Sequence, residues 1–448
     1  MKAAPGTPVN IVGAGLAGAL LAVLLARRGF AVTLYERRPD PRQATPERGR
    51  SINLALAARG IAALERAAVM AQVWPLTIEM RGRMVHELSG SVALQPYGQR
   101  PREVIYSVGR ADLNRVLIEE ALRHPGVTVR FSHQGLSADL GRDRLQLRDL
   151  ANGAEREVPL APTIATDGAG SAVRASLTAA GLVAVREEWL DHDYKELTIP
   201  ASAAGALDRH ALHIWPRGGF MLIALPNTDG SFTATLFLRR AGERGFTSLS
   251  TPSAVAAFFA REFPDAVALI PQLLDEFARN PQGQLGTVHA APWHAAGGVL
   301  LLGDAAHAIV PFHGQGMNAA FEDCRVLDDL IDAHDQWESL FVAFERARRP
   351  NTEAIAQMAL ENYAEMRDAV LDARFVRLKS LAMGLERRFP DRFIPRYSMV
   401  MFHPEIPYAE ALRRGALQAR LLEELDAGGE SDPGLAERLI RERLAPVV

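Results

Sequence analysis

The fold is decided by the stretch Val9-Asn10-Ile11-Val12-Gly13-Ala14-Gly15-Leu16-Ala17-Gly18. Val9 to Val12 predicts a short buried strand, and the apolar residues from Leu16 to Arg28 predict a helix packed against a sheet. The glycines between them match G-x-G-x-x-G. In this motif the first glycine permits a tight turn, the second lets the backbone approach a pyrophosphate, and the third lets helix and strand pack closely. The start of the helix then offers free N–H groups to an anion.

A carboxylate completes this motif. Gly29 predicts the end of the helix, Ala31 to Tyr35 predicts the next strand, and Glu36 ends that strand eighteen residues after Gly18. A carboxylate at about this offset accepts hydrogen bonds from a ribose 2′-OH and disfavours a 2′-phosphate, so the unit predicts bound FAD or NAD and not NADP. The competing interpretation is a glycine turn that binds nothing, and the strand, helix and carboxylate in their expected places argue against it.

Length and composition limit the class of protein. The chain has 448 residues, 48% of them hydrophobic, and a net charge of -3, which favours two or three globular domains and gives no case for a nucleic-acid partner. Cys324 is the only cysteine, which excludes an internal disulfide and a cysteine zinc cluster and suits the cytoplasm. No apolar stretch approaches the ~20 residues that span a bilayer, so we expect no membrane span.

The rest of the chain predicts a β-rich insertion and helices. Strands are expected in 80–110, with a turn at Ser89-Gly90-Ser91, and again as a meander in 196–237. A hairpin is expected around Asn152-Gly153. Helices are expected in 252–278, 337–385 and 405–444.

Two further glycine segments follow predicted strands. The first is Ala165-Thr166-Asp167-Gly168-Ala169-Gly170, and the second is Leu302-Gly303-Asp304-Ala305-Ala306-His307, which continues through Pro311-Phe312-His313-Gly314-Gln315-Gly316-Met317-Asn318 into a helix. A strand that ends in Gly-Asp puts a carboxylate at the carboxyl edge of a sheet, where ligands bind in doubly wound folds. Each segment alone could be an ordinary loop, because Asp-Gly is a common turn.

In this order and at these separations, the three segments resemble those of the p-hydroxybenzoate-hydroxylase-like flavoprotein monooxygenases. The resemblance implies an α/β fold with a Rossmann-like FAD-binding domain, an interleaved β-sheet substrate domain and a C-terminal helical region. It also implies one bound FAD, a transient NADPH and no metal. We expect the FAD-binding domain in residues 1–75, 103–180 and 285–335, the substrate domain in 76–102 and 181–284, and the helical domain in 336–448.

The resemblance also implies which residues bind FAD. Asp304 would bind the ribityl chain, the backbone of Gln315 to Asn318 would lie at the isoalloxazine ring, Arg110 would lie near the phosphates, and Asp167 would support both FAD and the transient NADPH. The full implied set is Gly13, Gly15, Leu16, Ala17, Gly18, Glu36, Arg37, Arg38, Ala55, Arg110, Leu136, Asp167, Asp304, Gly314, Gln315, Gly316, Met317 and Asn318.

Other stretches resemble the kynurenine-hydroxylating branch of this family. They are Gly49-Arg50-Ser51-Ile52-Asn53-Leu54-Ala55-Leu56, Tyr194-Lys195-Glu196-Leu197-Thr198-Ile199-Pro200, His213-Ile214-Trp215-Pro216-Arg217 and Glu361-Asn362-Tyr363-Ala364-Glu365-Met366-Arg367-Asp368. This resemblance implies hydroxylation of L-kynurenine to 3-hydroxykynurenine with NADPH and O₂, through a flavin C4a-hydroperoxide. The reaction belongs to tryptophan catabolism and NAD biosynthesis. The implied protein is a cytoplasmic monomer or homodimer.

The residues themselves suit an amino-acid substrate. An α-carboxylate needs a cation with fork geometry, which arginine supplies, and an aromatic ring needs an apolar slot. Arg83 lies on a predicted strand, and Tyr97 follows after a turn, close enough to return beside it. The resemblance implies that Arg83 and Tyr97 bind the carboxylate and that Asn362 and Tyr397 complete this polar end of the substrate site. It adds His313 and a ring slot of Ile105, Leu212, Met221, Ile223, Phe237 and Phe312.

Other interpretations stay open. Arg83 could be a solvated surface residue with Arg81 in its role, any single apolar slot residue could be plain core packing, and His313 could be a loop histidine that satisfies the backbone. The chain could hydroxylate another aromatic acid on the same fold. It could also be an FAD-dependent reductase without oxygen insertion, or a flavin-binding protein without catalysis.

Overall fold

The structure is a computed structural model that describes residues 3–43, 53–369, 372–428 and 434–447. The chain forms two compact units from interleaved segments. The first comprises Met1–Ile78, Tyr106–Asp191 and Gly283–Thr352, and the second comprises Glu79–Ile105, His192–Gln282 and Glu353–Val448. We expected the C-terminal helices to form a third domain. In the structure, the chain from Glu353 onward belongs to the second unit.

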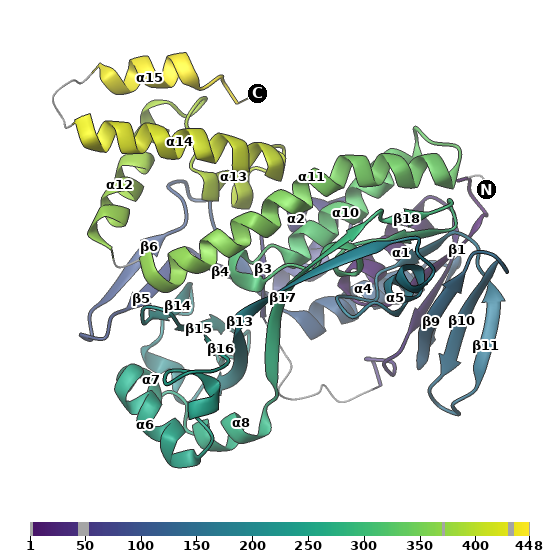
Figure 1. The fold of residues 1–448 in the computed structure, drawn as a ribbon, viewed down its shortest axis with the longest axis horizontal. Coiled ribbons are helices and arrows are strands. Elements are labelled where there is room, and N and C mark those ends of the chain that lie inside the picture. The colour runs from purple at the N-terminus through teal and green to yellow at the C-terminus, as the bar shows by residue number, and fades with distance from the viewer. Residues whose placement is uncertain (1–2, 44–52, 370–371, 429–433, 448) are drawn as a thin grey trace. The chain divides into compact units, whose positions relative to one another are not determined.

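A six-stranded sheet organises the first unit (Figure 1). Its order is β18 (His294–Ala295), β19 (Val299–Leu301), β12 (Thr163–Ala165), β1 (Pro8–Val12), β2 (Ala31–Glu36) and β8 (Val127–Phe131). All neighbours from β19 to β8 pair in parallel, and only β18 is antiparallel. Val12 pairs with Ala165 and Tyr35, and Ala165 pairs with Leu301, so the carboxyl ends of β19, β12, β1 and β2 share one edge.

Helices and two small sheets complete the first unit. Helix α1 (Leu16–Arg27) is buried from Gly18 to Leu25, as its apolar sequence predicts, and ends before Gly29, whose φ is 82°. The other helices are α2 (Ala58–Arg66), α3 (Met70–Val73), η1 (Trp74–Leu76), α4 (Arg110–Arg123), α5 (Ala172–Ala179), α9 (Asp304–His307), η4 (Pro311–His313), α10 (Gly316–Ile331) and the start of α11 (Trp337–Ala364).

The small sheets have the orders β3-β7-β4 and β11-β10-β9. Their strands are β3 (Asn53–Leu56), β7 (Ile105–Gly109), β4 (Thr77–Met80), β11 (Glu155–Pro159), β10 (Arg144–Asp149) and β9 (His133–Asp139). The hairpin predicted around Asn152-Gly153 is confirmed as β10 and β11 (Figure 1). Strand β9 escaped prediction because its burial does not alternate along the strand.

The second unit is built on a meander. Strands β14 (Ala211–Pro216), β15 (Met221–Pro226) and β16 (Phe232–Arg239) form an antiparallel meander, as predicted. Strand β13 (Ala184–Ile199), predicted as the first strand of this meander, instead pairs antiparallel with β16, because the chain from β13 passes beyond β15 and β16 before it enters β14. Strand β5 (Gly82–His86) then pairs parallel to β14, and β6 (Val92–Pro96) pairs antiparallel to β5. Strand β17 (Gln282–Ala291) follows β13 in the strand order, and its residues from Gly283 onward, like those of β13 up to Asp191, belong to the first unit.

Helices of the second unit form two groups. Helices α6 (Pro252–Glu262), α7 (Pro264–Val267) and α8 (Leu273–Arg279) share a hydrophobic cluster with the meander. The short helix η2 (Ala204–Ala206) lies between β13 and β14, and η3 (Phe246–Ser248) lies between β16 and α6. The C-terminal group is α12 (Ala373–Arg388), α13 (Arg396–Phe402), α14 (Tyr408–Gly428) and α15 (Leu435–Arg443), preceded by the π-helical turn η5 (Glu365–Ala369). The short helix α13 lies outside the helical ranges that we predicted. In the described part of the chain, no helix combines the length and apolarity needed to cross a bilayer.

Candidate FAD and substrate sites

The glycine turn lies at the carboxyl end of β1, in the centre of the first sheet. Gly13 has a φ of 98°, and a Cβ there would meet the Thr166 carbonyl oxygen at 2.7 Å. A Cβ on Gly18 would meet the Gly13 carbonyl oxygen at 2.0 Å, so this glycine permits the helix to pack on the turn. A Cβ on Gly15 would meet nothing within 4 Å. The turn is therefore closed on its protein side and open where a ligand would approach.

Glu36 stands at the end of β2, beside the glycine turn. It is 5% exposed, and its carboxylate accepts hydrogen bonds from the Ala14 N–H at 2.8 Å and from the Arg38 N–H and Nε, both at 2.9 Å. A carboxylate has about four acceptor positions, so these bonds leave room for a ribose hydroxyl. The structure thus puts Glu36 where the motif predicts it, and adds a structural role in holding the turn.

Two aspartates share the same sheet edge. Asp167 follows β12, where its Oδ2 accepts the Ala172 N–H at 2.9 Å and its buried Oδ1 accepts no hydrogen bond from the described residues. Burial raises the pKa of Asp167. Asp304 follows β19, and its side chain is exposed although residues 299–303 and 305–308 are all buried. Both aspartates therefore keep acceptor atoms for a ligand.

The predicted flavin segment is held by the side chain of Asn318, which is fully buried. Asn318 Oδ1 accepts the Ala57 N–H at 2.9 Å, and its Nδ2 donates to the carbonyl oxygens of Ala55 and Gly314, both at 2.8 Å. Gly314 is left-handed, with a φ of 64°. The side chain of Asn318 thus joins β3 to the start of α10. Residues 49–52, which begin the 49–56 stretch that resembles the kynurenine-hydroxylating branch, lie outside the described part of the chain.

Other predicted cofactor residues lie in varied settings. Leu16, Ala17, Leu136, Gly316 and Met317 are partly buried, and Gln315 is fully buried. Arg37 and Arg110 are exposed, with Arg110 at the start of α4. The roles of these residues stay predictions. Phe312 and His313 are each 6% exposed and form η4, in the first unit, directly before Gly314.

The first unit fits FAD. No side chain of the described residues caps the N-terminus of α1, so its first N–H groups are available to a pyrophosphate. Glu36, Asp167 Oδ1 and Asp304 supply acceptors at the same edge for hydroxyl groups. The open side of Gly15 leaves room for close approach by the ligand.

The second unit gathers the predicted ring-slot residues on one face of its sheet. Arg83 pairs with Leu212, Ile214 with Ile223, and Met221 with Phe237. Since paired residues point to the same face and alternate residues of a strand do so too, Arg83, Leu212, Met221, Ile223 and Phe237 share that face. The opposite face carries Leu222, Leu236 and Trp215, which pack in the cluster with α6 to α8. Ile105, which is 2% exposed, lies in another sheet at the start of β7.

Arg83 is the centre of a polar cluster in this unit. It is 4% exposed, and it donates to Glu365 Oε1 at 3.0 Å and to Asn362 Oδ1 at 3.2 Å. Its guanidinium lies 5.9 Å from the ring centroid of Tyr97 and 5.1 Å from that of Tyr397. The two tyrosine rings stack at 5.6 Å. The cluster unites all four residues predicted for the polar end of the substrate site.

The surroundings of this cluster keep its two tyrosines neutral and its arginine charged. Burial raises the pKa of Tyr97, and it raises that of Tyr397 to about 12, so both phenols stay protonated donors. Burial lowers the pKa of Arg83, but Tyr397 and Glu365 raise it by more. In contrast, Arg81 has a side chain that is 62% exposed and pairs with Glu79. The structure thus excludes a solvated Arg83 and puts Arg81 outside the cluster.

Sequence reasoning missed two ionisable members of this cluster. Glu365 was quoted only as part of the 361–368 stretch, although a carboxylate one helical turn from Asn362 was a usable signal. Lys379 gave no signal, and its pKa falls to about 8 because of burial and the charge of Arg83. Both groups bring charge to the polar end of the second unit.

Two of the stretches that resemble the kynurenine-hydroxylating branch have structural roles. Lys195 donates to the carbonyl oxygens of Phe277 and Asn280 at 2.8 and 2.9 Å, which fastens β13 to the end of α8. His213 and His86 join β14 to β5 through a 2.8 Å hydrogen bond between their rings. Trp215 Nε1 donates to Asp265 on α7 at 2.7 Å. These stretches hold the sheet and helices of the second unit together.

A family model described as FAD binding domain matches residues 6–359. The chain therefore belongs to this FAD-binding family, and it is an FAD-dependent aromatic monooxygenase. FAD is its cofactor. The α/β fold class predicted from the glycine segments is confirmed.

The chain is also similar over nearly its full length to individual enzymes of this family. A kynurenine 3-monooxygenase of Myxococcus xanthus (strain DK1622) is 47% identical over 452 residues, covering 100% of this chain and 97% of that protein. One of Stenotrophomonas maltophilia (strain K279a) is 48% identical over 425 residues, covering 94% of this chain and 93% of that protein. The resemblance to this branch of the family is confirmed over the whole chain.

Solved structures share the fold. The p-nitrophenol 4-monooxygenase PnpA from Pseudomonas putida DLL-E4 superposes with a TM-score of 0.67 at 18% identity, over 87% of this chain and 97% of that one. The tetrameric form of 2-methyl-3-hydroxypyridine-5-carboxylic acid oxygenase superposes with a TM-score of 0.65 at 20% identity, over 82% of this chain and 94% of that one.

Proposed function

We propose that this enzyme hydroxylates L-kynurenine to 3-hydroxykynurenine, with NADPH and O₂ as co-substrates. The observation that carries the proposal is the buried Arg83, whose fork lies among Asn362, Glu365 and two neutral tyrosines. The names of its relatives, at 47% and 48% identity over nearly their full length, support the same substrate.

The α-amino acid head suits the polar cluster. A carboxylate can accept two parallel N–H bonds from Arg83 and O–H bonds from Tyr97 and Tyr397, all of which keep their protons. Glu365 gives an α-ammonium group a partner of opposite charge. An aromatic acid without an amino group, such as p-hydroxybenzoate, offers Glu365 no such second partner beside Arg83.

The aryl ring suits the apolar face of the meander. Leu212, Met221, Ile223 and Phe237 share this face with Arg83, so the carboxylate group and the slot follow one another along the sheet. Bound FAD supplies hydride acceptance and oxygen activation, whereas the protein orients the substrate and excludes water. His313 and Phe312 directly precede the flavin segment and complete the proposed set.

The deciding experiment is mass spectrometry of the product formed from kynurenine, NADPH and O₂. We expect a product heavier by one oxygen atom, and much slower coupled NADPH oxidation with p-hydroxybenzoate or salicylate. NADPH oxidation with an unchanged kynurenine mass would instead identify a reductase, and turnover of another aromatic acid alone would identify a different hydroxylase. Cytoplasmic location and a monomeric or homodimeric state stay predictions.

A further inference from the structure

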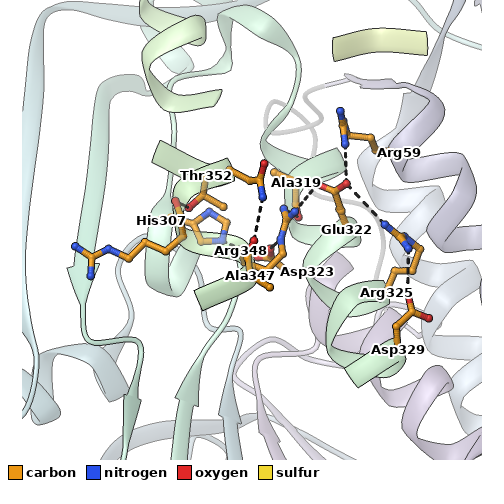
Figure 2. A network of polar contacts seen from close by, with 12 residues as sticks. Arg59, His307, Ala319, Glu322, Asp323, Arg325, Asp329, Ala347, Arg348 and Thr352 are labelled. Atoms are coloured by element: carbon orange, nitrogen blue, oxygen red, sulfur yellow. Dashed lines mark hydrogen bonds and ion pairs between the residues drawn. The ribbon is translucent and has the colours of Figure 1, made fainter. Parts of the chain in front are cut away.

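Figure 2 shows a buried ionic network in the first unit. A hydrogen bond from the Gly303 N–H to Asp323 joins this network to the Gly303-Asp304 segment. Its members are Arg59 on α2, Glu322 and Asp323 on α10, Arg348 on α11 and His307 on α9, which are 0–6% exposed. The cofactor residues implied by the resemblance include none of them.

Asp323 connects this network to the cofactor segment. Its Oδ2 accepts the Gly303 N–H at 3.2 Å and the His307 Nε2–H at 2.6 Å, so it holds both ends of the four-residue helix α9. Its Oδ1 accepts from Arg348 Nε at 2.6 Å. Gly303 has a φ of 61°, which glycine adopts without strain. Asp304, the next residue, is exposed.

Glu322 extends the network to a second cofactor segment. It accepts from Arg348 Nη1 at 2.6 Å and from Arg59 Nη1 at 2.7 Å (Figure 2). Arg59 follows β3, whose Ala55 carbonyl oxygen accepts from Asn318 at the start of α10. The network therefore reaches the Gly303-Asp304 segment, the flavin segment and β3 through helix α10.

The two carboxylates of this network stay ionised although they are buried. Burial raises the pKa of Asp323, but His307 and Arg348 lower it by more, and the two arginines have the same effect on Glu322. Buried ion pairs add little stability compared with apolar residues of similar volume, so stability alone is a weak reason for this one. What a rigid buried network adds is a defined geometry for the groups bonded to it.

We propose that Asp323 is a positioning residue for FAD, which holds Gly303 and His307 so that Asp304 meets the ribityl chain. Arg348 and Glu322 orient Asp323 in turn. The inference rests on FAD binding and is independent of which aromatic acid is hydroxylated.

The test is the FAD dissociation constant of the whole protein, measured by quenching of flavin fluorescence without substrate. Asp323→Asn keeps the shape of the side chain and removes its charge, and we expect it to weaken FAD binding by about 10- to 100-fold. Asp328→Asn is the matched control. Asp328 lies on the same helix, is 3% exposed and binds Arg28 and Arg66, and in the described part of the chain it is not hydrogen-bonded to residues 303–307. Its variant should bind FAD as the wild type does, even if it is less stable.

A second pair of variants tests the same link if Asp323→Asn fails to fold. His307→Gln keeps a donor for Asp323 and should retain FAD affinity, whereas His307→Leu should lose it. The inference is refuted if Asp323→Asn binds FAD like the wild type, if Asp328→Asn weakens binding equally, or if the two His307 variants bind alike. Because no substrate is present, these outcomes leave the proposed hydroxylation to be judged separately.

Discussion

At the scale of single residues, burial distinguishes Arg83 from Arg81. The two arginines stand two residues apart in one predicted strand, so both would point to the same face. The local sequence pattern therefore does not distinguish them. Arg83 lies in a polar cluster at 4% exposure, while the side chain of Arg81 is 62% exposed. The carboxylate partner of the substrate is therefore expected to be Arg83.

Replacement of these two arginines gives a direct prediction. Arg83→Gln removes the charged fork, and we expect the dissociation constant of kynurenine to rise about 10- to 100-fold, since a hydrogen bond to a charged group contributes about 1.5–3 kcal/mol. Stimulation of NADPH oxidation by substrate should be lost with it. Arg81→Gln is the control. Stopped-flow flavin reduction measures both, and equal behaviour of the two variants would contradict the assignment.

At the scale of elements, the β1–α1 turn separates a structural glycine from a ligand-facing one. Gly13→Ala adds a Cβ 2.7 Å from the Thr166 carbonyl oxygen at a φ of 98°, so the apoprotein should lose about 1–3 kcal/mol of stability. Gly15→Ala meets nothing within 4 Å and should leave apoprotein stability within about 0.5 kcal/mol.

FAD binding should respond differently to the second of these substitutions. The new methyl of Gly15→Ala occupies the side on which the pyrophosphate approaches, so FAD affinity should fall at least about tenfold. Urea unfolding of apoprotein and FAD titration together measure the two effects. Full FAD affinity in Gly15→Ala would show that the phosphates lie elsewhere.

At the scale of the whole molecule, His213 makes stability depend on pH. Burial lowers its pKa to about 4 from an ordinary 6.5, although the carbonyl of Asp208 opposes this. The unfolded chain therefore binds a proton below pH 6.5 that the folded protein refuses until about pH 4. Stability falls as pH drops through this window, by about 2 kcal/mol between pH 7 and pH 5.

Urea unfolding at these two pH values checks this effect. His213→Gln keeps a donor for the Asp208 carbonyl but cannot titrate, so its stability should fall by about 2 kcal/mol less than that of the wild type. The same pH dependence in both proteins would assign the effect to other groups.

Local patterns carried much of the prediction. The G-x-G-x-x-G turn, Glu36, the Gly303-Asp304 segment and the meander were all readable from short windows, because turn conformation and strand alternation depend on near neighbours. These features were enough to predict the FAD-binding fold, which the family comparison confirms. The specific roles of the site residues remain predictions.

The sequence by itself thus determined the nucleotide-binding turn, the class of fold and the order of its segments. Tertiary structure alone decided which arginine is buried, since Arg83 meets Glu365 across 282 residues of chain. It also decided that Asp323 supports Gly303, and that Arg83 shares a sheet face with Phe237. The physical reason is that burial and pairing depend on residues distant in sequence, whose approach no local period encodes.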